Sequence, residues 1–215
     1  MEFTGERYVP TEGGEIRHEH FHRYAWAAPL VEGKPVLVVA SGAGSASAML
    51  AKTAASVVGV DISPEAIEHA RATYPQSNLS FMEGSASELP LADASFDVVV
   101  SFETIEHLLD QEQMLAEIGR VLRPDGMLVI SSPNKEVYSE LSGLHNEFHV
   151  KELQWNELDA LLRRQFAHVE YFGHRLAVGS AIVPVTRAGD GLLYEALTDE
   201  ETEVSPRVMK MTNPV

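Results

Sequence analysis

Short apolar runs recur along the chain, and segments of helix-forming residues separate them. Runs of this length and composition are typical of buried parallel strands, and we predict five of them, at 35–40, 56–61, 79–84, 96–102 and 127–133. Helices are predicted between them, at 42–54 after a glycine turn, at 64–74 and at 112–122, with a turn at 123–126. This alternation predicts an α/β fold with a doubly wound, mostly parallel sheet and helices on both faces.

The ends of the chain extend this pattern. We predict a helix at 15–30, another at 151–165 and a sixth strand at 167–175, whereas 185–206 is rich in turn-forming and acidic residues and is expected to be a loop. The last residues begin like a seventh strand and stop. We expect one domain over 1–215, with an N-terminal helical lid (1–33), a core (34–182) and a final loop with a truncated strand (183–215).

Composition and charge exclude several classes of protein. The chain is 45% hydrophobic and 22% charged, and it has no cysteine, which excludes disulfides and thiolate metal sites and fits a cytoplasmic protein. No apolar run is long enough to span a bilayer, and the N-terminus does not have the pattern of a signal peptide. The formal net charge of −16 disfavours nucleic acid and anionic lipid as partners.

Three features meet at the carboxyl edge of the predicted sheet, where open α/β folds bind ligands. The turn ASGAGS (40–45) follows the first strand, and its glycines allow a ligand to approach the backbone. Asp61 ends the second strand and either binds the two hydroxyls of a ribose or caps the helix that starts after Ser63. The polar loop after the third strand is placed to contact an adenine ring.

The order of VLVVASGAGSA, VVGVD, FMEGSASELPLADASFDVVVS and LRPDGMLVISSPN resembles the class I S-adenosylmethionine-dependent methyltransferases over about residues 35–135. The resemblance implies a Rossmann-like fold and S-adenosyl-L-methionine as cofactor. It implies the following cofactor-binding residues: Ala40, Ser41, Gly42, Gly44, Asp61, Ile62, Ser85, Ala86 and Ser101. The chain departs from the family pattern at three positions: the family usually has an acidic residue at Val38, often an acidic residue or threonine at Ala43, and often an aspartate at Ser85.

The segment ETIEH (103–107) follows the fourth strand, beside the expected position of the reactive methyl group. If a helix starts at Glu103, then Glu106 and His107 share its face, and two carboxylates with one imidazole suit Mg²⁺, Mn²⁺ or Fe²⁺. The alternative is two acids near a helix N-terminus, which the helix dipole favours, with an ordinary histidine beside them.

Followed by SPN and by NEFHVKELQWNEL (146–158), ETIEH resembles the metal-dependent branch of the superfamily, which includes small-RNA 3′-end 2′-O-methyltransferases and ubiquinone-pathway O-methyltransferases. This resemblance implies Glu103, Glu106, His107 and His149 as metal ligands, with His145 as the fallback for His149. A divalent ion there would bind two adjacent hydroxyls and lower the pKa of one of them.

The N-terminal segment TGERYVPTEGGEIRHEHFHRYAWA resembles the start of bacterial methyltransferases that accompany glycosyltransferases in polysaccharide or glycan clusters. The resemblance implies a sugar-like acceptor and a fused or associated glycosyltransferase. His18, His20 and His22 recur at every second residue, so a helix cannot direct all three inward. His107 and either His20 or His22, as general base, are the candidate catalytic residues.

Three functions follow. The first is an S-adenosylmethionine-dependent O-methyltransferase, assisted by Mg²⁺ or Mn²⁺, that acts on a vicinal hydroxyl of a sugar or glycan. The second is a metal-independent methyltransferase of a small aromatic or natural-product substrate. The third is an inactive methyltransferase-like domain that scaffolds a glycosyltransferase. RNA 3′-end methylation fits the motif but not the net charge of −16.

Overall fold

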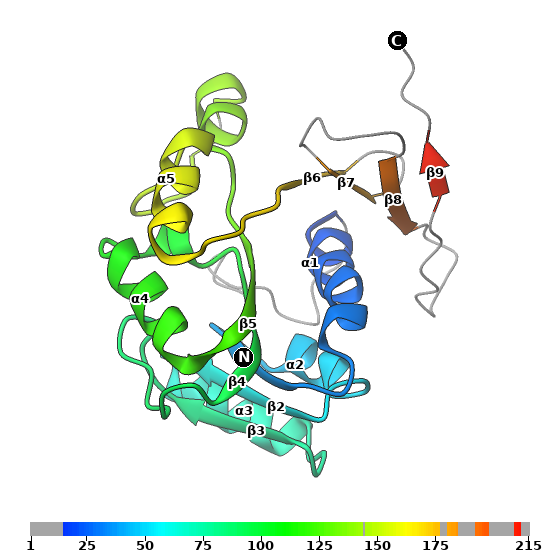
Figure 1. Cartoon of the computed structure of the whole chain (residues 1–215), viewed down its shortest axis with the longest axis vertical. Coiled ribbons are helices and arrows are strands. Elements are labelled where there is room, and N and C mark those ends of the chain that lie inside the picture. The colour runs from blue at the N-terminus through cyan, green and yellow to red at the C-terminus, as the bar shows by residue number, and fades with distance from the viewer. Residues whose placement is uncertain (1–14, 144, 177–179, 185–191, 198–208, 212–215) are drawn as a thin grey trace.

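The computed structural model describes residues 15–143, 145–176, 180–184, 192–197 and 209–211. A five-stranded sheet forms the centre of the molecule, with strand order β3-β2-β1-β4-β5 and parallel pairing throughout (Figure 1). Its strands are β1 (Pro35–Val39), β2 (Ser56–Asp61), β3 (Leu79–Glu83), β4 (Phe96–Phe102) and β5 (Leu122–Ser131). The predicted doubly wound, Rossmann-like fold is confirmed.

Both faces of this sheet are covered by helices, which explains why its central strands β1 and β4 are mostly apolar. On one face, Leu37 and Val39 of β1 pack with α4 (Gln111–Val121). On the other face, Val36 and Val38 pack with α2 (Ser45–Leu50) and with α1 (Glu15–Ala27), which continues into η1 (Ala28–Val31). Because β1 is buried on both faces, its alternating side chains are all hydrophobic.

The helix α3 (Pro64–Thr73) begins as the sequence predicts. The Ser63 Oγ accepts a hydrogen bond of 3.3 Å from the Ala66 N–H, and Pro64 stands in the first turn, where its missing N–H is not needed. The start of this helix therefore lies directly after the carboxyl end of β2.

The turn predicted at 123–126 is assigned to β5, which is a correction to its boundaries. Residues 123–126 nevertheless leave the regular ladder, because Phe96 pairs with Leu122 and Val98 already pairs with Met127. An ion pair of 2.6 Å between Arg123 and Asp97 holds this bulge against β4. The sequence signal for a break was correct, and the pairing on either side extends the strand across it.

The sixth strand differs from the prediction in position and in sheet. It is β6 (Phe172–Leu176), and it belongs to a second, antiparallel sheet with β7 (Ser180–Pro184), β8 (Leu192–Leu197) and β9 (Met209–Met211). Only three residues separate β6 from β7, and a parallel connection needs a dozen or more, so this pair forms an antiparallel hairpin. The loop predicted at 185–206 contains β8, and its other residues lie outside the described part.

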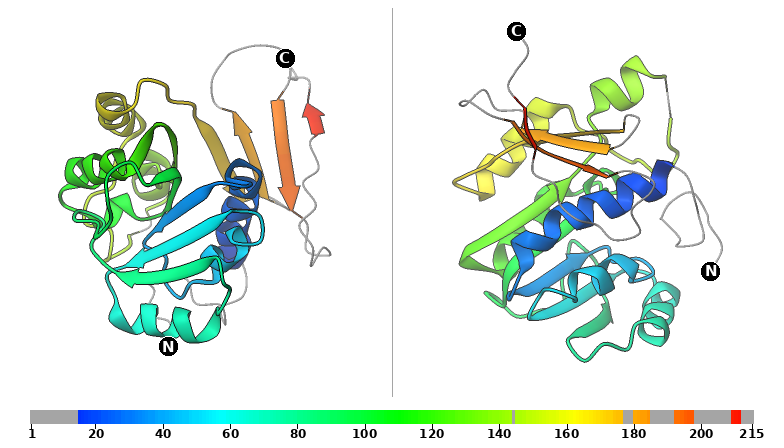
Figure 2. Two further views of the ribbon diagram at one scale, coloured as in Figure 1. Left: turned by 60° about the horizontal axis from the view of Figure 1, so that its bottom comes forward. Right: turned by 90° about the vertical axis from the view of Figure 1, so that its right-hand side faces the viewer.

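The two sheets enclose α1. This helix contacts α2 on one side and β7 and β8 on the other, as the views in Figures 1 and 2 show. The helix predicted at 151–165 is α5 (Trp155–Gln165), and a capping box between Gln154 and Glu157 fixes its start. Among the described residues, no helix has the length and apolar character to cross a membrane.

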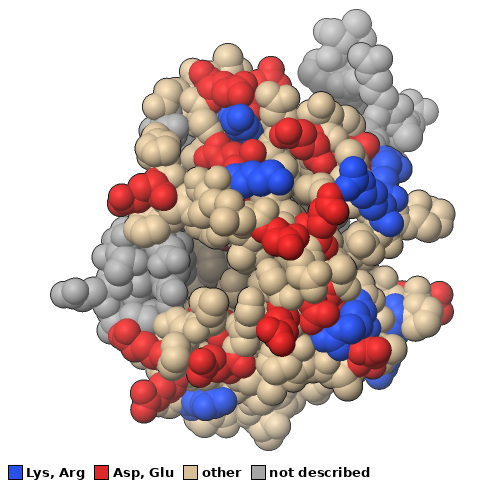
Figure 3. Space-filling view, turned by 90° about the vertical axis from the view of Figure 1, so that its left-hand side faces the viewer, with Lys and Arg blue, Asp and Glu red and all other residues tan. Residues whose placement is uncertain are grey.

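Charge is mixed on the surface. On the face in Figure 3, acidic and basic side chains are interspersed, and the described residues show no continuous basic area there. This distribution agrees with the excess of 32 acidic over 16 basic residues.

Candidate functional site

Asp61, at the end of β2, forms a hydrogen bond with the glycine loop. Its Oδ2 accepts a hydrogen bond of 2.8 Å from the Gly42 N–H, and its Oδ1 accepts one of 2.9 Å from the Ser63 N–H. The side chain is buried, so these bonds compensate for its lost hydration. Each carboxylate oxygen has a second lone pair, so the same side chain can still accept bonds from ribose hydroxyls.

The glycine loop turns by way of three left-handed residues. Ala40, Gly42 and Gly44 have φ values of 56°, 53° and 86°, and for Ala40 this conformation is unusual because it carries a Cβ. A Cβ at Gly44 would lie 2.7 Å from the Ala70 Cβ, so no larger residue fits. The loop thus lies tightly over α3 while its other side stays open.

A cavity of about 90 Å³ lies at this loop. Its walls are the loop itself, His20 and Tyr24 from α1, and Phe102 at the end of β4. The rings of Tyr24 and Phe102 meet edge to face at 4.8 Å, and burial raises the pKa of Tyr24 to about 12. The sequence analysis missed Tyr24 and Phe102, although Tyr24 lies four residues after His20 and therefore on the same face of α1.

Ile62, Ser85, Ala86 and Ser101 are not among the residues that line this cavity. Ile62, beside Asp61, is 70% exposed and offers an apolar surface outside the cavity. Ser85 accepts a hydrogen bond of 3.2 Å from the Ser87 N–H, and Ala86 packs against the core. Ser101 is fully buried, and its Oγ has no hydrogen-bond partner among the described residues.

Two departures from the family pattern have a packing role. Val38 is fully buried in the core between the sheet and α1, and Ala43 is buried in the loop at the cavity wall. A larger hollow, of about 540 Å³, lies at the other end of the sheet, lined by Lys34, Asp97, Arg123, Pro124, Asp125 and Met127. Because ligands of open α/β sheets bind at the carboxyl ends of the strands, we place the site at the smaller cavity.

A second group of side chains gathers just beyond β4. One ligand atom each from Glu106, His107 and His149 lie within 4.8 Å of one another, a spacing that suits a metal ion. Glu106 and His107 belong to the short 3₁₀ helix η2 (Ile105–His107), and the two imidazole rings are 5.1 Å apart.

Hydrogen bonds to backbone carbonyls connect η2 with the segment around His149, some forty residues later in the sequence. The His107 Nδ1 lies 2.8 Å from the Phe148 carbonyl oxygen, and the Lys151 N–H donates to the Glu106 carbonyl at 3.0 Å. Gln111, which the sequence analysis missed, donates from its Nε2 to the carbonyls of Ile105 (2.9 Å) and Lys151 (2.8 Å).

Glu106 is the least compensated charge of the site. It is fully buried, and neither carboxylate oxygen has a hydrogen-bond partner among the described residues. Burial, with a further contribution from the nearby Glu103, raises the pKa of Glu106 to about 8. A divalent cation beside it would compensate this charge, and one carboxylate with two imidazoles suits Mn²⁺ or Fe²⁺ better than Mg²⁺.

Glu103 does not share a helical face with Glu106 and His107, so the predicted helix start at Glu103 is wrong. Its φ of 49° is left-handed, and η2 begins two residues later. The Ser131 hydroxyl donates to the Glu103 Oε1 at 2.5 Å, which ties this side chain to the end of β5. Glu103 and the exposed His145 are both outside the group of three.

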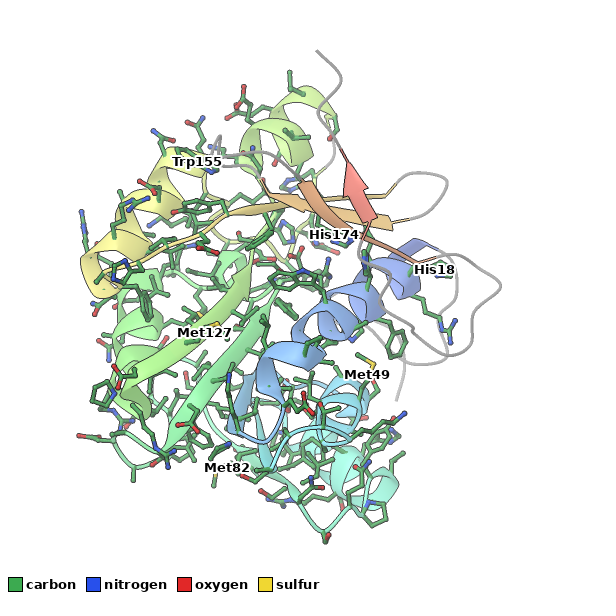
Figure 4. All side chains as sticks on the ribbon, turned by 45° about the vertical axis from the view of Figure 1, so that its right-hand side comes forward. His18, Met49, Met82, Met127, Trp155 and His174 are labelled. Carbon is green, nitrogen blue, oxygen red and sulfur yellow. The ribbon has the colours of Figure 1, made fainter. Side chains whose placement is uncertain are left out.

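The histidines of α1 are divided between different surroundings. His20 lines the cavity, whereas the buried His22 packs its ring 5.2 Å from His174 of β6. Burial, aided by the charge of Arg23, lowers the pKa of His20 to about 3 and that of His174 to about 4. Figure 4 shows His174 close to α1, and His18 near the N-terminal end of this helix.

Comparisons with known proteins agree with this geometry. Residues 37–130 match the family model described as a methyltransferase domain. A Mycolicibacterium smegmatis protein named "Probable S-adenosylmethionine-dependent methyltransferase" is 39% identical over 175 residues, which cover 79% of this chain and 66% of that protein. A "Ubiquinone biosynthesis O-methyltransferase" of Azorhizobium caulinodans is 32% identical over 127 residues, 58% of this chain and 50% of that protein.

The chain thus spans less than two thirds of the length of these relatives. Among solved structures, the YcgJ protein of Bacillus subtilis has the same fold, with a TM-score of 0.63 at 23% identity over 76% of this chain and 74% of that one. Residues 37–130 therefore match a methyltransferase domain, and the chain is similar in sequence to proteins named as S-adenosylmethionine-dependent methyltransferases.

Proposed function

We propose that this protein is an S-adenosylmethionine-dependent O-methyltransferase that uses a divalent cation and methylates one of two adjacent hydroxyls of a sugar or glycan. The observation that carries this proposal is the buried, unpartnered carboxylate of Glu106 beside His107 and His149. It lies four residues after Phe102, which lines the cavity of the glycine loop. The two halves of a methyl transfer, donor and acceptor, would therefore meet at the end of β4.

The donor half consists of the glycine loop, Asp61 and the two rings over the cavity. Asp61 would accept hydrogen bonds from the ribose hydroxyls, and Tyr24 and Phe102 offer aromatic edges and faces to a cationic sulfonium group. S-adenosylmethionine, when bound, supplies an electrophilic methyl group. The cavity of about 90 Å³ is smaller than typical ligand sites, so the rest of the cofactor would lie along the open surface near Ile62.

The acceptor half consists of Glu106, His107 and His149. A divalent cation held by these three residues supplies a Lewis acid that favours the ionised form of a nearby hydroxyl. His20 is a weak general base because its pKa is lowered to about 3, which favours assistance by a cation over assistance by this histidine. The products would be a methyl ether and S-adenosylhomocysteine.

The acceptor is proposed from chemistry and from the relatives together. A cation coordinates two adjacent hydroxyls better than one, and both a sugar diol and a catechol-like ring carry such a pair. The resemblance of the N-terminal segment to methyltransferases of glycan clusters favours the sugar and, with it, a role in polysaccharide biosynthesis beside a glycosyltransferase. The name of the Azorhizobium relative supports methylation of an oxygen atom in general.

Titration calorimetry tests the proposal. We expect S-adenosylhomocysteine to bind, and Mn²⁺ to bind more tightly than Mg²⁺, with metal analysis showing a bound divalent ion. His107→Ala should lose the cation and keep the cofactor, whereas His69→Ala, an exposed histidine of α3, should keep both. Cofactor binding without any cation would support the metal-independent methyltransferase, and binding of neither would support the inactive domain.

A further inference from the structure

Both imidazoles of the proposed ion site are held through the same ring atom. The His107 Nδ1 lies 2.8 Å from the Phe148 carbonyl oxygen, and the His149 Nδ1 lies 2.6 Å from the Glu152 Oε1. A carbonyl or a carboxylate oxygen only accepts, so both Nδ1 atoms carry the proton and donate it. In the neutral imidazole, both Nε2 atoms then keep their lone pair, which is the form that binds a metal.

Glu152 is not an ordinary surface acid. Its side chain is 10% exposed, and that of His149 is 8% exposed. The second oxygen of Glu152 accepts a hydrogen bond from the Ser139 hydroxyl, which belongs to the π-helix η3 (Glu136–Leu141). The neighbouring Tyr138 places its ring 5.3 Å from the His149 ring.

We infer that Glu152 is a positioning residue of the ion site, which fixes the orientation and the tautomer of His149 and connects η3 to that site. This inference rests on the proposed function. Histidine ligands commonly donate their second N–H to a carboxylate, which orients the ring and increases its basicity toward the metal. Glu152, whose Oε1 lies 2.6 Å from the His149 Nδ1, is such a carboxylate.

Charge balance agrees with this role. Glu106 is fully buried and Glu152 nearly so, and their charges have the same sign. A divalent cation bound by neutral imidazoles would balance the negative charges of these two carboxylates. The alternative is a structural ion pair between Glu152 and a protonated His149, which would leave Glu106 uncompensated and give Glu152 no effect on a cation.

Cation affinity of the whole chain tests the inference. Mn²⁺ and Co²⁺ would be titrated into the wild type, Glu152→Gln, Glu152→Ala and Glu147→Gln, the last being an exposed acid two residues from His149. We expect Glu152→Ala to weaken binding by about 10- to 100-fold, the range for outer-shell partners of metal ligands. Glu152→Gln should lose less, because its amide oxygen still accepts from the Nδ1–H, and Glu147→Gln should match the wild type.

A second measurement distinguishes a positioning role of Glu152 from a role in folding. The visible absorption of bound Co²⁺ should change in Glu152→Ala and recover toward the wild type in Glu152→Gln, while the metal-free melting temperatures of wild type and Glu152→Gln stay alike. Equal affinities and equal Co²⁺ spectra for Glu152→Gln and Glu147→Gln would overturn the role of Glu152, even if Glu152→Ala does not fold. A wild type that binds no cation would overturn the proposed ion site together with this inference.

Discussion

Asp61 and Glu106 are two buried carboxylates at the same edge of one sheet, and their surroundings are opposite. Asp61 ends β2, and each of its oxygens accepts a backbone hydrogen bond. Glu106 follows β4 and is equally buried, but neither of its oxygens has a partner among the described residues. A compensated charge stabilises the fold around it, whereas an uncompensated one raises its own pKa and favours a ligand that brings positive charge.

This difference separates the two halves of the site. The donor half is shaped by backbone hydrogen bonds and tight glycine packing, and it exists before any ligand arrives. The acceptor half combines imidazoles with buried carboxylates, whose negative charge a bound cation would compensate. Ligands should therefore change the stability of the acceptor half more than that of the donor half.

Asp61→Ala should have the largest effect on stability. It would leave the N–H groups of Gly42 and Ser63 without an acceptor and lower the free energy of unfolding by about 3 kcal/mol. Cofactor affinity should fall as well. Urea unfolding and calorimetry measure both, with the exposed Asp125→Ala as control. An unchanged affinity for S-adenosylhomocysteine would place the ribose elsewhere.

Glu106→Gln should act in the opposite way. The free energy of unfolding of the metal-free protein should stay the same near neutral pH and rise above pH 8, because the substitution removes a buried carboxyl without a partner that becomes charged there. Mn²⁺ affinity should fall by on the order of 100-fold, or about 2.7 kcal/mol, since a ligand is lost. Calorimetric titration measures this, and a variant that binds Mn²⁺ like the wild type would exclude Glu106 from the site.

The pH dependence of stability should show the charge of Glu106 directly. Its pKa in the folded protein is raised from 4.5 to about 8, so between these values the folded state holds more protons than the unfolded state and stability falls as pH rises. The lowered pKa values of His20 and His174 act in the opposite direction, but only below their ordinary value of 6.5.

From pH 6.5 to 8, Glu106 should therefore contribute a loss of about 2 kcal/mol to the unfolding free energy of the metal-free wild type. Glu106→Gln should remove this loss, and so should saturating Mn²⁺. Urea unfolding at several pH values measures it. Identical slopes for wild type and Glu106→Gln would show that Glu106 is not the group responsible.

Ala40→Gly should have the smallest effect. Ala40 has a left-handed φ of 56°, which glycine adopts without strain, so the substitution should raise the free energy of unfolding by about 1 kcal/mol. Ala43→Gly is the matched control, because Ala43 is buried and is not among the left-handed residues. A loss of stability in both variants would argue against strain at Ala40.

The parallel sheet was predictable because its signal is local. Each of the five strands contains a short run rich in apolar residues, and Ser63 with Pro64 marks a helix start without any tertiary context. The spacing of Glu106, His107 and His149 was read from a motif, and the structure brings these three together. Glu103 was misplaced because a left-handed backbone residue cannot be recognised from a glutamate in the sequence.

The order of strands and helices, the glycine loop and the acid that ends β2 can be read from the amino-acid pattern, because periodicity and turn chemistry act between near neighbours. Three features depend on the folded chain: Tyr24 and Phe102 meet over the cavity, Glu152 contacts His149, and β6 belongs to the second sheet. The tertiary structure also decided that Asp61 is compensated and Glu106 is not. These outcomes depend on burial and on contacts between distant segments, and a pattern along the chain does not contain them.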